Sequence, residues 1–433
     1  MNETTSGTWP WIAYNAMLGV TVPVWGPYAA WRLTRGNSRL GRGERMGFGE
    51  RLPKSDHRVW IHGASVGEMM AMRPIADRFH AKCPEAPVVV STVTPTGQEV
   101  ARKSFAWAEQ VRYFPLDMPG PVARSISGVG ARVHALAETE LWPNFLHAAA
   151  RRGPVVLLNG RISDRTFQNA QRILPAYRWM VGHLSIVAMQ TQADADRITE
   201  LGADPSRVRV LGTSKFDEPV PQMDAAALRE WRRRLGLRDD RVAIAGSIFP
   251  GEDEAVLNAF IASRARIPSL RLLIAPRHVE RAPDIHALAL SAGLKPGFRS
   301  ANLDGDEDVI VIDTYGELAE LYALAEVAFV GKSLGTEEGG QNLIQPMAHG
   351  VPVVHGPNMQ NFRDVAARAE EVGASRVVQD AAALADAWTS LLASEVKRRG
   401  MGEAGRALVE SNRGAADAYA DVLREALKGC PPG

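Results

Sequence analysis

From residue 59 onward, short runs of β-branched and aliphatic residues alternate with longer stretches of helical periodicity. Apolar runs of this length are typical of strands buried on both faces of a parallel sheet. Strand–helix alternation is the pattern of βαβ units, so we expect an α/β fold with two doubly wound, Rossmann-like domains. The predicted strands form two series: 59–62, 87–92, 110–114, 132–137, 154–159, 186–190 and 208–211, then 242–246, 270–275, 309–312, 327–330 and 351–355.

The joint between the two series is expected at residues 216–224, where Pro219 and Pro221 interrupt the periodicity. A chain of 433 residues is long enough for two or three domains. We therefore assign residues 36–216 to a first domain and 217–428 to a second. Two such domains facing each other would place a ligand cleft at the carboxyl ends of both sheets.

The amino-terminal segment departs from this pattern because residues 4–31 carry no charge and are rich in tryptophan and valine. Their length suits a bilayer crossing, although Pro10, Pro23 and Pro27, with Gly19 and Gly26, would kink a helix. We predict a hydrophobic membrane anchor over residues 1–35. A helix docked on the core is the alternative, and a cleaved signal peptide is disfavoured because no basic residues precede the apolar run.

A basic flank follows this segment. Residues 32–58 hold eight lysines and arginines against three acids, a net +5. Anionic headgroups attract such a flank, and the positive-inside rule keeps it in the cytoplasm. We therefore expect the protein at the cytoplasmic face of the inner membrane.

Overall charge and cysteine content narrow the class of protein further. The net charge is +1, so no global field attracts a nucleic acid polymer. The two cysteines, Cys83 and Cys430, are too few for a disulfide framework or a CxxC-type zinc site. A reducing compartment is the simpler interpretation.

Candidate chemistry follows several predicted strands of the first domain. The sequence HGASVGE, residues 62–68, joins a strand to a helix, and the free N–H groups of a helix start suit an anion. Glu68 in this turn could be catalytic or only a favourable partner of the helix dipole. A second turn, residues 91–97, carries hydroxyls that suit either a helix cap or a ligand contact. Glu138 and Glu140 follow the strand 132–137, and two carboxylates there suggest function.

The second domain repeats this arrangement. Residues 246–252 join strand to helix and could seat a phosphate, and Arg277 follows the next strand, where a guanidinium could pair with it. Residues 313–318 and 339–346 complete a set of loops along one sheet edge.

Taken in order, these strings resemble those of the Kdo (3-deoxy-D-manno-octulosonic acid) transferases: SVGE, TPTG, ETELWPN, NGRIS, GTSKFD, PRHVER, DTYGELAELY, FVGKSL and GGQN. The resemblance covers nearly the whole chain. It implies the two-domain GT-B architecture, with the acceptor handled by the amino-terminal half and the CMP-sugar by the carboxyl-terminal half. It also implies an inverting, metal-independent transfer of Kdo from CMP-Kdo to a lipid A precursor, with no cofactor, at the cytoplasmic face of the inner membrane.

The resemblance also assigns site residues. Glu68 matches the family's general base, which takes the proton of the acceptor hydroxyl. Residues near the acceptor cleft would be Ser65, Gly67, Thr96, Glu138 and Glu140. The donor-binding loops would contribute Ser247, Gly251, Glu252, Arg277, His278, Gly316, Glu317, Leu318, Asn342 and Gln345.

Three positions depart from the family pattern. Phe249 stands where the family has histidine, and Gln341 and Gln345 stand where it has histidine and glutamate. Losing the carboxylate at Gln345 costs a charge-assisted bond worth on the order of 1 kcal/mol. A GT-B transferase for another nucleotide sugar, an epimerase acting on one, and a non-catalytic relative with a degenerate donor site are therefore the alternatives.

Overall fold

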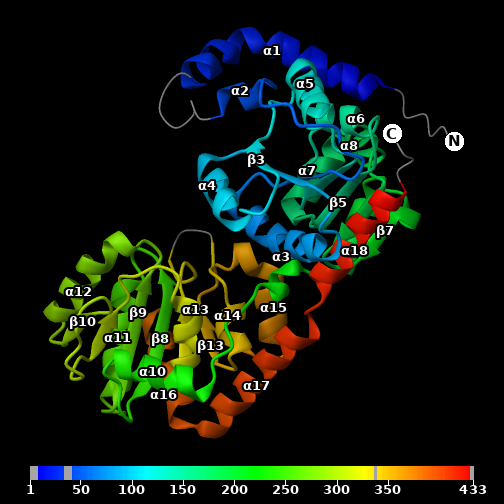
Figure 1. Cartoon of the computed structure of the whole chain (residues 1–433). Helices are drawn as coiled ribbons and strands as arrows, with labels where there is room; N and C mark the ends of the chain where they lie inside the picture. Colours follow the sequence, from blue (N-terminus) through cyan, green and yellow to red (C-terminus); the bar gives the residue numbers. More distant parts are fainter. Residues whose placement is uncertain (1–7, 34–40, 336–338, 430–433) are drawn as a thin grey trace. The chain divides into compact units, whose positions relative to one another are not determined.

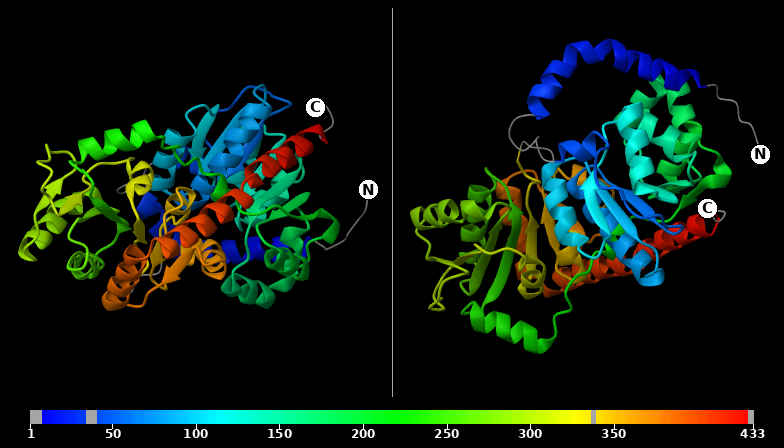
Figure 2. Two further views of the ribbon diagram at one scale, coloured as in Figure 1. Left: turned by 90° about the horizontal axis from the view of Figure 1, so that it is seen from below. Right: turned by 45° about the horizontal axis from the view of Figure 1, so that its top comes forward.

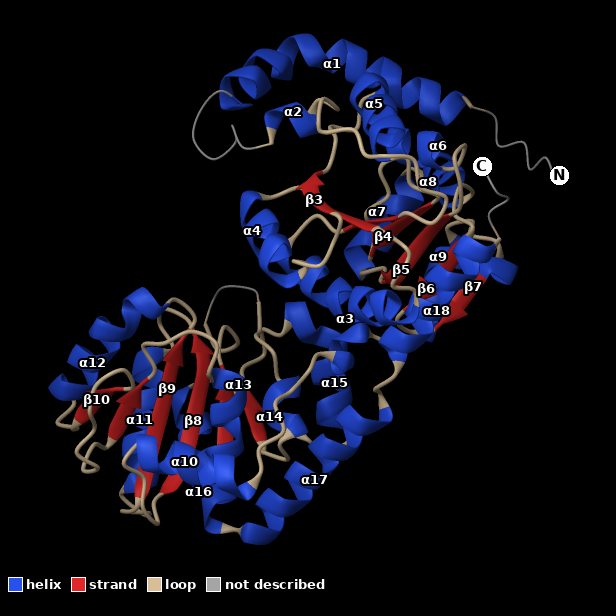
Figure 3. Ribbon diagram, in the orientation of Figure 1, coloured by secondary structure: helices blue, strands red, loops and turns tan. Residues whose placement is uncertain are grey.

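The computed structural model describes residues 8–33, 41–335 and 339–429. The chain divides into two compact units, the first made of residues 1–218 and 413–433 and the second of residues 219–412. Each unit is a parallel sheet covered by helices on both faces (Figure 1; Figure 3). This is the predicted fold class, two α/β domains.

The sheet of the first unit has the strand order β3-β2-β1-β4-β5-β6-β7, with every pair parallel. The order reverses between β1 and β4, which is the topological switch point where doubly wound sheets bind ligands. The strands are β1 Val59–His62, β2 Val88–Thr92, β3 Gln110–Tyr113, β4 Val133–Ala137, β5 Val155–Gly160, β6 Ile186–Met189 and β7 Val208–Val210.

Helices cover both faces of this sheet, and several begin at a serine or threonine whose hydroxyl accepts a backbone N–H of the first turn, as Ser65 and Thr94 do. The helices are α1 Trp9–Leu33, α2 Arg42–Arg45, α3 Val66–Lys82, α4 Pro95–Ser104, α5 Pro119–Val129, α6 Pro143–Ala149, α7 Asp164–Arg172, α8 Leu174–Val181, α9 Gln192–Glu200 and α18 Ala415–Lys428, with 3-10 turns at Pro205–Arg207 and Ser214–Asp217.

The second unit has the order β10-β11-β9-β8-β12-β13-β14, again all parallel, with the switch point between β8 and β12. Its strands are β8 Arg241–Ile248, β9 Leu270–Pro276, β10 Pro296–Phe298, β11 Val309–Val311, β12 Val327–Val330, β13 Val353–His355 and β14 Ser375–Val377. Its helices are α10 Ala225–Arg234, α11 Asp253–Arg264, α12 Ala282–Ser291, α13 Leu318–Leu321, α14 Ile344–Ala348, α15 Arg363–Glu371, α16 Ala381–Ala393 and α17 Glu395–Ser411, with 3-10 turns at Val279–Arg281, Tyr322–Leu324 and Gln360–Phe362.

The apolar strands form the cores. Side chains of β1, β2, β4 and β5 alternate between two apolar clusters, one on each face of the first sheet. All the predicted strands are confirmed to within a few residues at their ends. The prediction missed β10 and β14, three-residue strands at the two edges of the second sheet.

The carboxyl-terminal helix corrects the predicted boundaries. Residues 413–428 were assigned to the second domain, but α18 packs on α3 in the first unit (Figure 2). Its apolar face supplies the buried side chains of Tyr419 and Leu423 to the core, and the Tyr419 hydroxyl donates to the Gly212 carbonyl at 2.7 Å. The other boundary lies between Glu218 and Pro219, inside the predicted joint.

Helix α1 has two contrasting faces. On its inner face, which packs on α6 and α8, Trp11 Nε1 and Asn15 Nδ2 donate to Asn144 Oδ1 at 2.8 and 2.9 Å. Among residues 9–21, whose side chains the structure describes, the outer face carries Trp9, Ile12, Met17 and Val20, which are 59%, 55%, 57% and 76% exposed. The helix is therefore docked through polar groups and presents apolar ones outward.

The membrane-anchor prediction for residues 1–35 stays a prediction. In the described residues, hydropathy identifies no helix with the length and apolar character of a membrane span. Residues 1–7 and 34–40, with Arg35 and Arg39 of the basic flank, lie outside the described residues. Arg58 does not belong to a headgroup-facing flank, because it is buried and forms an ion pair with Glu109.

Candidate functional site

Three glutamates gather where β1 and β4 end. Glu68 lies in the first turn of α3, which follows β1, and its carboxyl oxygens accept hydrogen bonds from the Ala64 backbone N–H at 2.7 Å and the Ser65 hydroxyl at 2.8 Å. These two bonds fix the carboxyl group at the helix start. Ser65 also caps the helix by accepting from the Glu68 N–H.

Glu138 and Glu140 follow β4, the neighbour of β1 in the sheet. Glu138 has φ +50°, a left-handed conformation that costs a non-glycine residue energy and is often found at functional sites. Burial and, after it, the charge of Glu68 together raise the pKa of Glu140 to about 7, although a hydrogen bond from Trp142 opposes the rise. Burial likewise raises the pKa of Glu138, and Lys215 opposes this. The predicted grouping of Glu68 with these acids is thus found in the first unit.

His62, which the sequence analysis did not single out, belongs to the same group. It ends β1, is fully buried, and its Nε2 lies 3.9 Å from Glu140 Oε2. Burial lowers its pKa to about 3, although a bond to the Ser91 carbonyl opposes the shift. The feature of the sequence that could have indicated His62 is its place as a polar residue at the end of an otherwise apolar strand.

The remaining acceptor-side predictions are Gly67, which directly precedes Glu68 in α3, and Thr96 in the first turn of α4. Gly67 is exposed, and a Cβ there would meet only Ser65 Oγ at 3.9 Å, so no close contact demands glycine. Thr96 is exposed and lines a pocket of about 470 Å³ with Glu44, Arg102 and others, whose lining does not include the three glutamates. Contact of Gly67 and Thr96 with an acceptor stays a prediction.

In the second unit, Glu252 connects the loops at the switch point. Its carboxylate accepts from the backbone N–H groups of Phe249, Lys332, Ser333 and Leu334 at 2.8, 2.7, 2.8 and 2.9 Å. A carboxylate has about four lone-pair sites, and here all are used. Glu252 was predicted to bind the donor, but this geometry gives it a structural role, tying the loop after β8 to the loop after β12.

The same two loops are in close contact and conformationally strained. Ser247 and Lys332 both have φ +55°, and Gly251 has φ +91°. A Cβ on Gly331 would lie 2.5 Å from the Ser247 carbonyl oxygen, so the loops can approach only over a glycine. The predicted donor residues Ser247 and Gly251 therefore belong to a rigid turn.

Positive charge and aromatic rings meet beside this turn. The Lys332 ammonium lies 4.7 Å from the centre of the Phe249 ring, which makes an edge contact with the His278 ring at 5.6 Å. His278 and Arg277 are exposed. The Arg277 backbone N–H donates to the Ile248 carbonyl at 3.0 Å, but its guanidinium makes no hydrogen bond or ion pair with the described residues. An imidazole is therefore present beside Phe249, supplied by the loop after β9.

The last predicted donor residues lie in loops after β11 and β12. Gly316 has φ +88°, and Glu317 forms an ion pair with Arg299 at 3.0 Å just before Leu318 begins α13. Asn342 Oδ1 accepts the Ile344 N–H at 2.9 Å at the start of α14. Gln345 is half-buried within α14.

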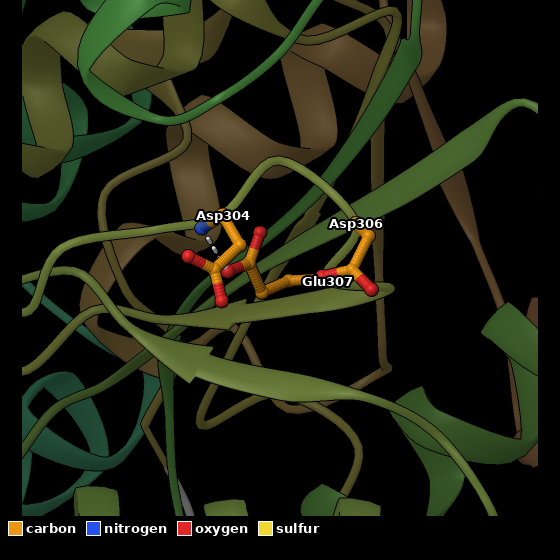
Figure 4. Close-up of side chains that lie close together, drawn as sticks. All are labelled: Asp304, Asp306 and Glu307. Carbon is orange, nitrogen blue, oxygen red and sulfur yellow. Dashed lines mark hydrogen bonds between the residues drawn. The ribbon is translucent and has the colours of Figure 1, made fainter.

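A separate acidic cluster lies in the second unit, in the loop between β10 and β11. Ligand atoms of Asp304, Asp306 and Glu307 lie within 4.8 Å of one another (Figure 4). Glu307 already accepts the N–H groups of Asp304 and Gly305, and Asp306 forms an ion pair with Lys295. These bonds explain the cluster as a turn-stabilising group.

Comparison with known proteins agrees with this arrangement. Residues 41–218 match the family model described as 3-deoxy-D-manno-octulosonic-acid transferase (kdotransferase), and residues 298–408 match that of glycosyl transferases group 1. The 3-deoxy-D-manno-octulosonic acid transferase of Haemophilus influenzae is 33% identical over 395 residues, covering 89% of this chain and 91% of that protein. The enzyme of the same name from Bordetella pertussis is 34% identical over 382 residues, covering 85% and 87%.

Similarity to solved structures concerns the fold. A glycosyltransferase from Rickettsia africae matches 87% of this chain and 100% of its own with a TM-score of 0.57 at 13% identity. Two parallel-sheet α/β units of this kind agree with the predicted GT-B architecture. With the match to the Haemophilus relative over most of both chains, the protein is a glycosyltransferase that belongs to the 3-deoxy-D-manno-octulosonic acid transferase family.

Proposed function

We propose that this enzyme transfers Kdo from CMP-Kdo to the hydroxyl of a lipid A precursor. The observation that carries the proposal is the trio of carboxyl groups at the switch point of the first unit, in a chain of the Kdo transferase family. A fixed carboxyl group at this position can accept a proton from an attacking hydroxyl. The family name supplies the transferred sugar.

Glu68 is the general base in this proposal. Its carboxyl group is fixed by the Ala64 N–H and the Ser65 hydroxyl, so it loses little freedom when a substrate binds. As the acceptor oxygen attacks the anomeric carbon, Glu68 takes its proton and the bond from that carbon to the phosphate oxygen breaks. Glu68 lies close enough to Glu140 for its charge to raise the pKa of Glu140.

The second unit binds the nucleotide in this proposal. CMP leaves with additional negative charge on its phosphate, and cationic groups stabilise such charge. The exposed Arg277 guanidinium has no hydrogen-bond or ion-pair partner among the described residues, and Lys332 lies over the Phe249 ring, which contacts His278, the residue after Arg277. Glu252 supports the site indirectly, by holding the loop that carries Lys332.

Membrane association forms a separate part of the proposal. We infer that α1 lies in the plane of the inner membrane at its cytoplasmic face, with Trp9, Ile12, Met17 and Val20 among the lipid headgroups and acyl chains. The polar bonds from Trp11 and Asn15 to Asn144 support this orientation, because they use the polar side chains inward and leave apolar ones outside. A lipid acceptor would then be reached without leaving the membrane surface.

The decisive experiment incubates the full chain with a CMP-Kdo generating system and a lipid A precursor, and counts added sugars by mass spectrometry. Transfer of at least one Kdo is the expected result. Parallel reactions with UDP-sugars test the alternative suggested by Phe249 and Gln345, that the enzyme uses a different nucleotide sugar as donor. Turnover of a UDP-sugar with no turnover of CMP-Kdo would refute the proposal, and calorimetric failure to bind CMP would favour a degenerate donor site.

A further inference from the structure

The orientation of the His62 ring is fixed from three sides. Nδ1 lies 3.1 Å from the Ser91 carbonyl oxygen and 3.0 Å from the Ser91 hydroxyl oxygen. A carbonyl oxygen only accepts, so this contact assigns the ring proton to Nδ1. Phe114 stacks on the ring at 3.6 Å with an interplanar angle of 16°, which prevents it from turning. Nε2 is therefore a fixed acceptor carrying a lone pair.

Nε2 has no hydrogen-bond partner among the described residues although it is completely buried. The group that faces it is Glu140 Oε2 at 3.9 Å, and this same oxygen accepts the Trp142 indole N–H at 2.8 Å. If Glu140 were ionised, the lone pairs of its carboxylate oxygen would face the lone pair on His62 Nε2, and the two groups could not form a hydrogen bond. A neutral carboxyl could instead donate its O–H to Nε2 after a shift of about 1 Å, which would satisfy the buried atom.

The surroundings of Glu140 favour the same protonation state. Glu68 faces it from α3 and Glu138 from its own loop, and both are acids. His62 is the titratable group facing it from β1, and it remains neutral because burial lowers its pKa to about 3. Two cations from other elements, Lys215 in the 3-10 turn Ser214–Asp217 and Arg161 after β5, act on Glu138.

We propose that His62 is a positioning residue whose Nε2 accepts the O–H of Glu140 and so keeps Glu140 neutral beside Glu68. The inference rests on the proposed Kdo transfer for its consequence, and on the geometry above for the pairing itself. No proton leaves Glu140 in this pairing, since it is a hydrogen bond only. Glu68 then remains the carboxyl group that takes the acceptor's proton.

A pH dependence follows from the pairing. As pH rises through about 7, Glu140 ionises and places a second negative charge where an acidic sugar must react. We expect kcat/KM to fall over that range. Replacing His62 removes a hydrogen bond that favours the neutral form, so the pKa of Glu140 falls and the decline moves to lower pH by about one unit.

The chain offers a matched control in His134. It is also fully buried, on the neighbouring strand β4, and neither ring nitrogen has a partner among the described residues. His62→Phe and His134→Phe therefore make the same change in the same core. We expect only His62→Phe to shift the pH profile, and an unshifted profile, or equal shifts in both variants, would overturn the inference.

Two further measurements test the pairing if His62→Phe folds poorly or if the protein transfers no Kdo. Glu140→Gln cannot ionise, so its kcat/KM should lack the decline above pH 7, and a decline that persists would contradict the pairing. The ring-nitrogen NMR signal of His62 reports the bond without any turnover. Its Nε2 resonance should move as Glu140 ionises and should stay constant with pH in Glu140→Gln. A resonance insensitive to pH in the unmodified chain would refute the pairing, whereas absence of Kdo transfer alone would refute only the proposed function.

Discussion

The structural role of Glu252 can be tested by replacing one oxygen of its carboxylate with the NH₂ group of an amide. In Glu252→Gln, an NH₂ group would face two of the four backbone N–H donors that now bind the carboxylate. Each lost bond to a charged group is worth about 1.5 to 3 kcal/mol, so the free energy of unfolding should fall by about 3 to 6 kcal/mol. For a unit of this size, that corresponds to a decrease in Tm of roughly 10 °C.

The assay follows unfolding of the full chain by calorimetry, with and without CMP. Glu254→Gln is the matched control, because Glu254 lies two residues away on the same helix, is exposed, and carries the same charge. We expect a large loss of stability for Glu252→Gln and almost none for Glu254→Gln. Unchanged stability of Glu252→Gln together with loss of CMP binding would show that the reasoning is wrong and that Glu252 contacts the donor, as the sequence suggested.

Three other predictions concern catalysis, the donor and the membrane. Glu68→Gln should lower kcat by about 10² to 10⁴ and leave CMP affinity near its original value, and retained turnover in the transfer assay would remove Glu68 as the base. Arg277→Ala should weaken CMP binding measured by calorimetry by about 1.5 to 3 kcal/mol without lowering Tm, whereas Arg281→Ala should lower Tm because that guanidinium pairs with a buried aspartate. Val20→Glu should reduce sedimentation of the protein with anionic vesicles at high salt, and sedimentation equal to that of the original chain would contradict the in-plane helix. Asn144→Ala should make α1 accessible to protease while vesicle binding persists.

Much of the fold could be predicted from the sequence because its strands are buried on both faces. Runs such as residues 155–158 and 327–330 are uniformly apolar, and that pattern is local. The edge strands β10 and β14 escaped prediction because three residues at a sheet edge carry too little pattern. The return of residues 413–428 to the first unit was not predictable from an amphipathic helix alone, since its partner α3 is distant in sequence.

The candidate site was predictable in part for the same reason. Glu68, Glu138 and Glu140 follow neighbouring parallel strands, so their grouping follows from topology. Glu252 was assigned to the donor because the bonds that saturate it come from residues some 80 positions later. His62 was missed because the sequence does not distinguish a functional buried histidine from one that only fills the core. The difference lies in the group that faces its free ring nitrogen, which here is Glu140.

The placement of α18 has a consequence for how the chain folds as it leaves the ribosome. The second unit is continuous, from residue 219 to 412, and has all its strands once those residues are made. The first unit begins earlier but receives Ala416, Tyr419 and Leu423, which close one face of its core, only from a helix that follows the whole second unit in the chain. Domains normally fold in order from the amino terminus. Here the first unit cannot complete its core until the second unit has been synthesised, and until then the apolar face of α3 is uncovered.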